Sequence, residues 1–469
     1  MWRVKVDVTL INEDATSEPT EIRCRIEERI PGDWTGVDEW EQQVRHIGFS
    51  AMRRLFCCGI QLMEQQLLAT WTHRDQTCRL VKRGKTGITL ATLFGKVRVA
   101  RQRVLCRTCQ QWLIPVNGSL GLGEEPCEAM TCGFKELLSF CALHQPYRQA
   151  QRMVGRITQD DGSTSFKQIH RIATREGARV RKREDDDKEQ TFHEAARPWM
   201  EGRPPPSPEE LIDGVLYICL DGIYVRACPG RKRWREAKVG FLCTDAREVV
   251  GRRKKRVPTK RYVSGFVSGA TLMRKVYAEA LELGFGRYRE VFVVGDGAGW
   301  VRTIHRDAFS TAVYVLDWYH LREKVRRAFR QSLPDDDKER RRQRKEVLAD
   351  FWMGRKKMAL HRLEALRARL VAQGRPDILT PRGGLNELIG YVENNWDGII
   401  DYGTMQEPGY MVASSLVEKA ADLVIAKRQK KLQGMHWGWY GADGVAALRT
   451  LWLNDDWEAY WEGQRRKAA

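Results

Sequence analysis

Two apolar runs of the chain each end at an aspartate that lies next to glycine. Asp221 follows LYICL (216–220), and Asp296 follows VFVVG (291–295). Short runs rich in Val, Leu and Ile predict buried strands. If the two strands are neighbours in one sheet, both carboxylates lie at the same end of it, where they repel each other unless a divalent cation lies between them. The pair therefore predicts a Mg²⁺ (or Mn²⁺) site suited to phosphodiester chemistry.

Each aspartate also has a simpler interpretation. Asp221-Gly222 between apolar runs is a strong hairpin-turn signal, so Asp221 could be a turn residue. Gly295-x-Gly297 could begin a dinucleotide-binding loop. However, Trp300 stands where the third glycine of that fingerprint belongs, and Asp296 would repel a pyrophosphate. We therefore reject the phosphate loop and leave the turn open.

The order of elements around these strands predicts an α/β fold. Three strands come first, followed by alternating helices and strands, which is typical of a mixed sheet covered by helices. The expected strands are 215–226, 236–244, 261–267, 290–294 and 312–317, and the expected helices are 271–284, 300–308 and one from 319. Residues 335–375 are rich in Arg and Lys, and we expect them to be helical.

A third carboxylate, Glu418, lies in the predicted helix SSLVEKAADLVIAKRQKKL. A first-turn glutamate can project towards the edge of a sheet. Ser415-x-x-Glu418 is also a capping box, in which the glutamate only satisfies a backbone N–H. Spacing does not separate these two interpretations.

The charge balance favours a polyanionic partner. The chain has 80 Lys and Arg against 61 Asp and Glu, a net charge of +19, and its cations occur in clusters that can neutralise phosphates. One cluster ends the Glu418 helix, and its candidate phosphate contacts are Lys427, Arg428, Lys430 and Lys431. No apolar run is long enough to span a bilayer, and the N-terminus alternates like a strand rather than a signal peptide. We therefore expect a soluble, cytoplasmic and nucleoid-associated protein whose 12 cysteines are thiols or metal ligands.

Taken together, the motifs resemble those of DDE transposases of bacterial insertion sequences. The series is DG at 221, GDGAGW around 296, DWYH at 317–320 and SSLVE followed by KRQKKLQGMHWGWYGADGVAALRTLW. The Kra-type insertion sequences are the most similar group, and mutator-like transposases are similar more distantly. The resemblance covers about residue 88 to the C-terminus, and it implies an RNase H-like core with a mixed five-stranded sheet.

The resemblance also implies roles for particular residues. Asp221, Asp296 and Glu418 match the metal-binding triad, and Asp317-x-x-His320 matches a motif near the active site of mutator-like relatives. An alternative for His320 is a residue at a helix start that satisfies local backbone. The 122 residues between Asp296 and Glu418 leave room for the helical insertion of related transposases.

Cys106-x2-Cys109 is half of a zinc site. In the similar transposases a second pair upstream completes a zinc ribbon, and at that place this chain has Cys78 with Asp75 or His73 as its partner. The alternative is that these cysteines are ordinary thiols of a degenerate ribbon.

Residues 146–177 are predicted to form two short helices joined by a turn, with Ser163 or Ser165 capping the second. This segment resembles the helix-turn-helix of the same transposases. Its second helix would enter a major groove, with Lys167, Gln168 and His170 as candidate contacts.

These observations predict a Mg²⁺-dependent DDE transposase that binds its element ends as double-stranded DNA, as a homodimer or larger assembly. The alternatives are a domesticated, non-catalytic DNA-binding protein and a structure-specific nuclease with the same fold. The charged RKREDDDKEQ and proline-rich GRPPPSPEE segments are expected to break regular structure before the core. The predicted regions are 1–135 (strands, helix, zinc ribbon), 136–200 (helix-turn-helix), 201–334 and 406–469 (catalytic core) and 335–405 (helical insertion).

Overall fold

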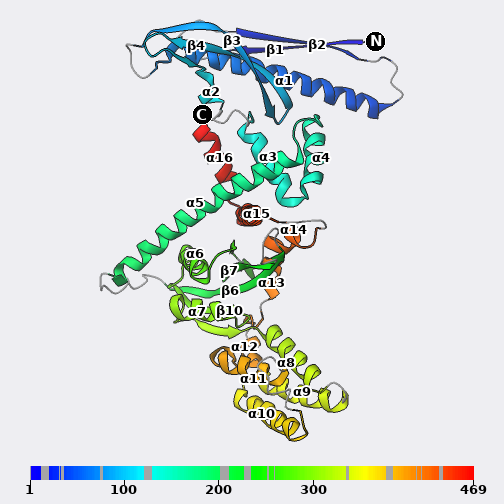
Figure 1. Cartoon of the computed structure of the whole chain (residues 1–469), viewed down its shortest axis with the longest axis vertical. Helices are drawn as coiled ribbons and strands as arrows, with labels where there is room; N and C mark the ends of the chain where they lie inside the picture. The colour runs from blue at the N-terminus through cyan, green and yellow to red at the C-terminus, as the bar shows by residue number, and fades with distance from the viewer. Residues whose placement is uncertain are drawn as a thin grey trace. The chain divides into compact units, whose positions relative to one another are not determined.

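The computed structural model divides the chain into two compact units, residues 1–176 with 456–469, and residues 177–455 (Figure 1). The structure describes the following residues: 2–11, 21–30, 32, 36–73, 78–120, 129–200, 211–226, 234–250, 253–257, 259–333, 337–375, 384–407, 409–413, 415–432 and 437–468.

The first unit combines two small antiparallel sheets with helices. The predicted N-terminal strands pair as β1 (Trp2–Ile11) and β2 (Glu21–Ile30). The long helix α1 (Val37–Thr70) packs through Ile60 against Leu90, Val97 and Val99 of the β3–β4 hairpin. That sheet consists of β3 (Leu80–Thr92), β4 (Gly95–Cys106) and β5 (Gln111–Leu113), and the unit also contains α2 (Val116–Ser119), α3 (Cys132–His144) and α16 (Trp457–Ala468).

The expected pair of helices near residue 146 is present as α4 (Tyr147–Thr158) and α5 (Phe166–Met200). Ser165 caps α5, because its Oγ accepts from the backbone N–H of Gln168 at 3.2 Å. The Gln168 side-chain oxygen accepts in return from the backbone N–H of Ser165 at 3.1 Å, which completes a capping box. Of the two candidate caps, Ser165 is therefore confirmed.

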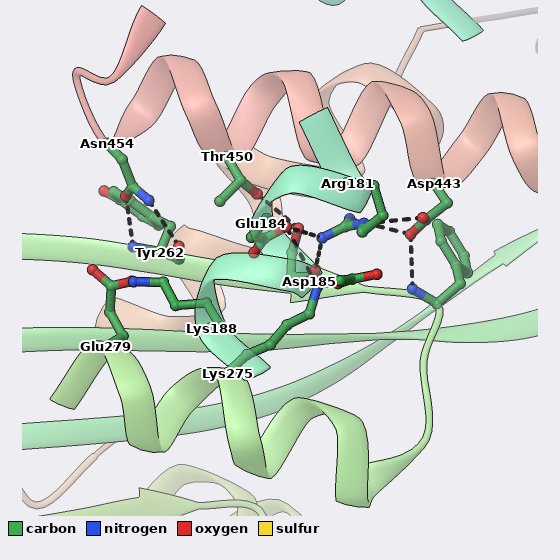
Figure 2. A network of polar contacts seen from close by, with 12 residues as sticks. Arg181, Glu184, Asp185, Lys188, Tyr262, Lys275, Glu279, Asp443, Thr450 and Asn454 are labelled. Atoms are coloured by element: carbon green, nitrogen blue, oxygen red, sulfur yellow. Dashed lines mark hydrogen bonds and ion pairs between the residues drawn. The ribbon is translucent and has the colours of Figure 1, made fainter. Parts of the chain in front are cut away.

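Helix α5 corrects the prediction that RKREDDDKEQ breaks regular structure, because the helix runs through this segment without interruption. From Gly177 onwards α5 belongs to the second unit. The Arg181 guanidinium donates to both carboxylate oxygens of Asp443 at 3.0 and 3.1 Å and to the main-chain oxygen of Ser264 at 2.6 Å (Figure 2). Residues on other elements thus pair with the charges of this segment, which in the sequence alone resembles a solvent-exposed linker.

The same network continues along α5 (Figure 2). Lys188 pairs with the buried Glu279 at 2.7 Å, and the buried Lys275 pairs with Asp185. Gly177 of α5 lies against Gly444 of the later helix α15 (Trp439–Leu453): a Cβ built on Gly177 would lie 2.3 Å from the Gly444 carbonyl oxygen. This half of α5 is therefore an integral part of the second unit.

The second unit is built on a mixed sheet. Five strands lie in the order β11-β10-β6-β7-β9, and β8 (Arg253–Val257) pairs with the far end of β7. Strand β10 is parallel to β6 and to β11, whereas β7 is antiparallel to β6 and to β9. The strands are β6 (Ile212–Arg226), β7 (Trp234–Val250), β9 (Lys260–Gly265), β10 (Tyr288–Gly295) and β11 (Val313–Leu316), so the five predicted strands are confirmed.

Helices α6 (Gly269–Glu282) and α7 (Gly299–Ala308) cover one face of this sheet. Leu216, Ile218 and Leu220 of β6 point into this core, where they meet Val276 and Ile304. Helix α13 (Ser415–Ala421) packs on β6 and β7, and α15 (Trp439–Leu453) packs on β9.

The predicted helical segment follows β11 and α8 (Trp318–Ser332). It contains α9 (Asp337–Trp352), α10 (Lys356–Ala372), α11 (Gly384–Asn394), a 3-10 turn (Trp396–Gly398) and α12 (Tyr402–Gln406). The Trp318 ring of α8 packs edge-to-face against Trp352 and at a tilt against Tyr402, at ring-centroid distances of 4.9 and 5.0 Å. These helices therefore form one packed body with α8.

Candidate active site and metal centre

Asp221 and Asp296 lie side by side where the parallel pairing of β6 with β10 ends. Leu220 of β6 is in register with Gly295 of β10, and each is followed directly by an aspartate. The expectation that the two strands are neighbours is confirmed. The edge beyond the carboxyl end of a parallel strand such as β10 is the usual place for a site in an α/β sheet.

The turn interpretation of Asp221 is wrong. The β6–β7 ladder runs without interruption through Asp221 opposite Val239 and Gly222 opposite Lys238. Gly222 is needed for another reason: a Cβ on it would lie 2.2 Å from the Oε1 of Glu236. The Glu236 carboxylate is held there by Lys238 at 2.8 Å and by the indole N–H of Trp300 at 3.3 Å.

The loop after β10 is held on several sides. The Asp296 carboxylate accepts from the backbone N–H of Ala298 at 2.9 Å. Gly297 has φ +80°, and a Cβ there would lie 2.6 Å from the Oδ1 of Asn395. The Tyr391 hydroxyl donates to the main-chain oxygen of Asp296 at 2.8 Å, and Arg302 donates to that of Gly297 at 2.6 Å. These contacts fix the backbone that carries the carboxylate.

Asp317 and His320 lie at the end of the next strand. Asp317 is fully buried and caps α8 by accepting from the His320 backbone N–H at 2.8 Å, so His320 lies in the first turn of this helix. Its carboxylate is also 3.5 Å from the His320 ring Nδ1. The bond to Asp317 raises the pKa of His320 to about 9, against the effect of burial, and the charges of Asp221 and Asp296 raise it further. His320 is therefore a cation at neutral pH that lies beside the two aspartates.

Glu418 approaches the same place from α13. Its side chain is exposed, and its charge is among those that raise the pKa of Asp221 to about 6. Burial is the largest cause of that shift, and Asp296 is the next. The structure thus brings Asp221, Asp296, Glu418 and His320 together. The side chain of Ser415 lies outside the described residues, so the capping alternative stays open.

One turn after Glu418, its helix changes from α-helical to π-helical geometry. Residues Asp422–Ala426 form a π-helical turn before α14 (Lys427–Gln429). A π-turn leaves carbonyls without their usual α-helical donors. The Arg449 guanidinium of α15 donates through Nε to the oxygens of Leu423 at 2.8 Å and Val424 at 3.1 Å. Burial, and then the charge of Arg428, lowers the pKa of Arg449 to about 10. Arg449 therefore stabilises the irregular turn behind Glu418.

The predicted DNA contacts differ in accessibility. Lys167 and His170 of α5 are exposed, whereas the side-chain oxygen of Gln168 is occupied in the capping box. At the end of the Glu418 helix the exposed cations are Lys427, Lys430 and Lys431. Arg428 corrects the prediction for this cluster, because it is fully buried with its guanidinium 4.9 Å from the centroid of the Trp437 ring.

Four residues of the first unit form a candidate zinc site. The ligand atoms of His73, Cys78, Cys106 and Cys109 all lie within 4.8 Å of one another. The sulfurs of Cys78 and Cys109 are 3.7 Å apart, close to the ~3.8 Å expected for two sulfurs of a zinc tetrahedron. A hydrogen bond from the backbone N–H of Cys109 is the main reason that the pKa of Cys106 falls to about 6. The cluster could hold a zinc ion with His73 as the fourth ligand, and the other predicted candidate, Asp75, lies outside the described residues.

Several residues at the site were not predicted from the sequence. Tyr391 and Asn395 come from α11 and the residue after it, about 95 residues after Asp296, and nothing local marks them. The contacts of Glu236 and Lys238 were also missed. A signal was available nearby, because RKRWR (231–235) combines cations with tryptophan next to the strand that pairs with Asp221.

Within the described part of the chain, no helix has both the length and the apolar character needed to cross a membrane. No curated protein sequence matches the chain significantly. The profile of one protein family, described as the uncharacterised protein family UPF0236, matches residues 31–454 and so covers both compact units. The chain therefore belongs to the uncharacterised protein family UPF0236.

Proposed function

We propose that this protein is a DDE transposase, which binds the ends of a DNA element and catalyses strand cleavage and strand transfer. The observation that carries the proposal is the adjacency of Asp221 and Asp296 at the edge of the sheet, with Glu418 near enough for its charge to act on Asp221. The two aspartates follow paired residues of parallel strands, and the charge of Glu418 acts on Asp221. Three carboxylates from distant parts of the chain are costly to gather unless their combined charge has a use.

The sheet supports an RNase H-like core. Numbered along the chain, its five strands lie in the order 3-2-1-4-5 when read from β9, with only the second antiparallel to its neighbours. This is the order that the resemblance implies for the catalytic core. The helical segment from α9 to α12 lies between β11 and the Glu418 helix, where the resemblance places an insertion.

The carboxylates fit a divalent cation with hard oxygen ligands. Asp296 and Glu418 both raise the pKa of Asp221 and so disfavour its ionised form, and a Mg²⁺ or Mn²⁺ ion would relieve this repulsion. Asp221, Asp296 and Glu418 would hold the ion. When bound, such an ion lowers the pKa of the attacking water or 3′-hydroxyl and stabilises charge on the scissile phosphate.

The residues around the carboxylates would orient the substrate. His320, kept cationic and fixed by Asp317, would attract a phosphate oxygen beside the aspartates. Lys427, Lys430 and Lys431 would bind the DNA backbone, and Lys167 and His170 of α5 would contact the element end in double-stranded form. We expect at least two copies of the chain on DNA, because a transposase must join two ends.

The proposal is tested by incubating the purified protein and its Asp296→Asn variant with Mg²⁺ and DNA that carries the element ends. The wild type should nick the ends and join them to a target. Asp296→Asn should bind the same DNA but cleave it about a thousandfold or more slowly, because the ligand charge is gone. The exposed pair Arg306–Asp307 supplies a matched control, Asp307→Asn, which should cleave normally.

Other outcomes identify the alternatives. A wild-type protein that binds ends but never nicks them would be a non-catalytic DNA-binding protein, and nicking without joining would indicate a nuclease. Glu418→Gln separates the two interpretations of Glu418. It retains a capping side chain but removes the charge, so cleavage within tenfold of wild type would exclude Glu418 from the triad.

A further inference from the structure

The β6–β7 ladder does not end at the carboxylates. It continues for five residues beyond Asp221, to Arg226 opposite Trp234. On one side of this extension Val225 and Ala237 are buried. The other side carries Tyr224 and Trp234, each 56 % exposed. Because side chains on paired strands alternate between faces, the two rings lie on one face as diagonal neighbours.

This end of the ladder is strongly basic. Between residues 226 and 235 the sequence has five cations and no acid: Arg226, Arg231, Lys232, Arg233 and Arg235. Arg226, opposite Trp234, is exposed on the face of the rings, whereas Arg235 lies opposite Val225 on the other face, with its guanidinium 4.0 Å from the centroid of the Trp439 ring. The nearest carboxylate along the strand, Glu236, is neutralised by Lys238 at 2.8 Å. A second copy of the chain would bring the same positive charge to this face, so the charge favours a polyanion over self-association.

The exposed rings lie close to the carboxylates along strand β6. Tyr224 lies three residues beyond Asp221 on the same extended strand, about 10 Å along it, with its side chain on the opposite face of the ladder. Lys238 links the two regions, since it pairs with Gly222 and lies 5.5 Å from the centroid of the Trp300 ring beside the Asp296 loop. An unpaired strand that passes from the carboxylates around this end of the ladder would therefore meet the exposed aromatic rings on its other face.

We propose that Tyr224 and Trp234 form a stacking platform for an unpaired DNA strand next to the carboxylate site. Exposed aromatic rings flanked by cations bind single strands, because unstacked bases lie on the rings while the cations neutralise the phosphates. In a duplex the base faces are already stacked and are not available to such rings. The placement of the platform beside a catalytic site rests on the proposed function. Binding of a single DNA strand to the two rings, however, does not require cleavage.

The test measures binding of a fluorescent oligothymidylate to the full-length protein without added Mg²⁺, so that no reaction takes place. Tyr224→Ala and Trp234→Ala should each weaken binding by about 5- to 100-fold, and Tyr224→Phe should retain affinity because it keeps the ring. Replacing Arg226 by Gln should reduce the salt slope by about 0.7. Circular dichroism should show that every variant is folded.

Trp112 provides the matched control. It is 58 % exposed and has Arg103 5.3 Å from its ring centroid, but it lies on β5 of the first unit. Trp112→Ala should change the affinity by less than about twofold. Equal weakening in Trp112→Ala and Trp234→Ala, equal weakening for duplex and single-stranded DNA, or no binding of oligothymidylate by the wild type would each overturn the platform. Strand binding through these rings in a protein that never cleaves would instead overturn only the proposed transposase activity.

Discussion

The hydroxyl of Tyr391 donates a hydrogen bond of 2.8 Å to the main-chain oxygen of Asp296. Tyr391 belongs to α11 of the helical insertion, whereas Asp296 follows a central strand of the sheet. One turn further along the chain, the Oδ1 of Asn395 accepts from Arg302 at 3.1 Å, and Arg302 also binds the oxygen of Gly297. The insertion thus fixes the backbone that carries a candidate metal ligand.

We expect Tyr391→Phe to weaken divalent-metal binding about tenfold, since residues that orient metal ligands typically contribute that much. Mn²⁺ titration followed by electron paramagnetic resonance measures this on zinc-loaded protein, independently of cleavage. Tyr410→Phe is the control, because Tyr410 also donates to a β10 residue, Glu290, but at the opposite end of the strand. Equal Mn²⁺ affinities in the two variants would show that Tyr391 does not position Asp296.

The Cys/His cluster should hold one zinc ion per chain. Cys109→Ser removes a ligand that lies 3.7 Å from Cys78 and 4.0 Å from His73, so its zinc content should fall well below one after dialysis. Cys57→Ser, outside the cluster, should keep the ion. Inductively coupled plasma mass spectrometry measures both, and wild-type protein containing much less than one zinc would refute a structural site.

Gly222→Ala should destabilise the second unit by about 1–3 kcal/mol, because the new Cβ would collide with a carboxylate that Lys238 and Trp300 hold in place. Combining it with Glu236→Ala should recover part of the stability. Gly59→Ala in α1, where the added Cβ meets nothing within 4 Å, should be neutral or stabilising. Urea denaturation midpoints compare the variants, and identical midpoints for Gly222→Ala and Gly59→Ala would contradict the crowding.

The cations after Glu418 should divide into exposed residues that bind DNA and a buried residue that stabilises the fold. Replacing the exposed Lys427 and Lys430 by Gln should lower the salt slope of duplex binding by about 0.9 for each phosphate that is no longer neutralised. Arg428→Gln should leave that slope unchanged and lower the melting temperature, because it removes packing on Trp437. A reduced slope in Arg428→Gln would restore Arg428 to the DNA surface.

The central strands were predictable because each is a short apolar run with a polar end. Asp221 and Asp296 thereby define the carboxyl edge of the sheet before any contact is known. Local sequence did not reveal which charges are paired. Lys188 belongs to a run that resembles a linker, and its buried partner Glu279 is 91 residues away. Only the folded chain brings them together.

Arg428 illustrates the same limit within a single helix. In the sequence it is equivalent to Lys427 and Lys430, and helical phase alone does not predict its burial. What decides it is Trp437, which follows the end of the helix and stacks on the guanidinium. Tyr391 was missed for a similar reason, because its role depends on how α11 docks near the end of β10.

The π-turn at Asp422–Ala426 makes the phase of one helix depend on a single residue. A π-turn accommodates one residue more than an α-helical turn, and each helical residue turns the chain by about 100°. Deleting one residue from this turn would restore a regular helix with nearly the same composition. It would also rotate Glu418 by about a quarter-turn relative to Lys427 and leave Arg449 facing carbonyls that are already bonded. Chain length at this turn, more than residue identity, thus sets the direction in which Glu418 projects relative to the lysines.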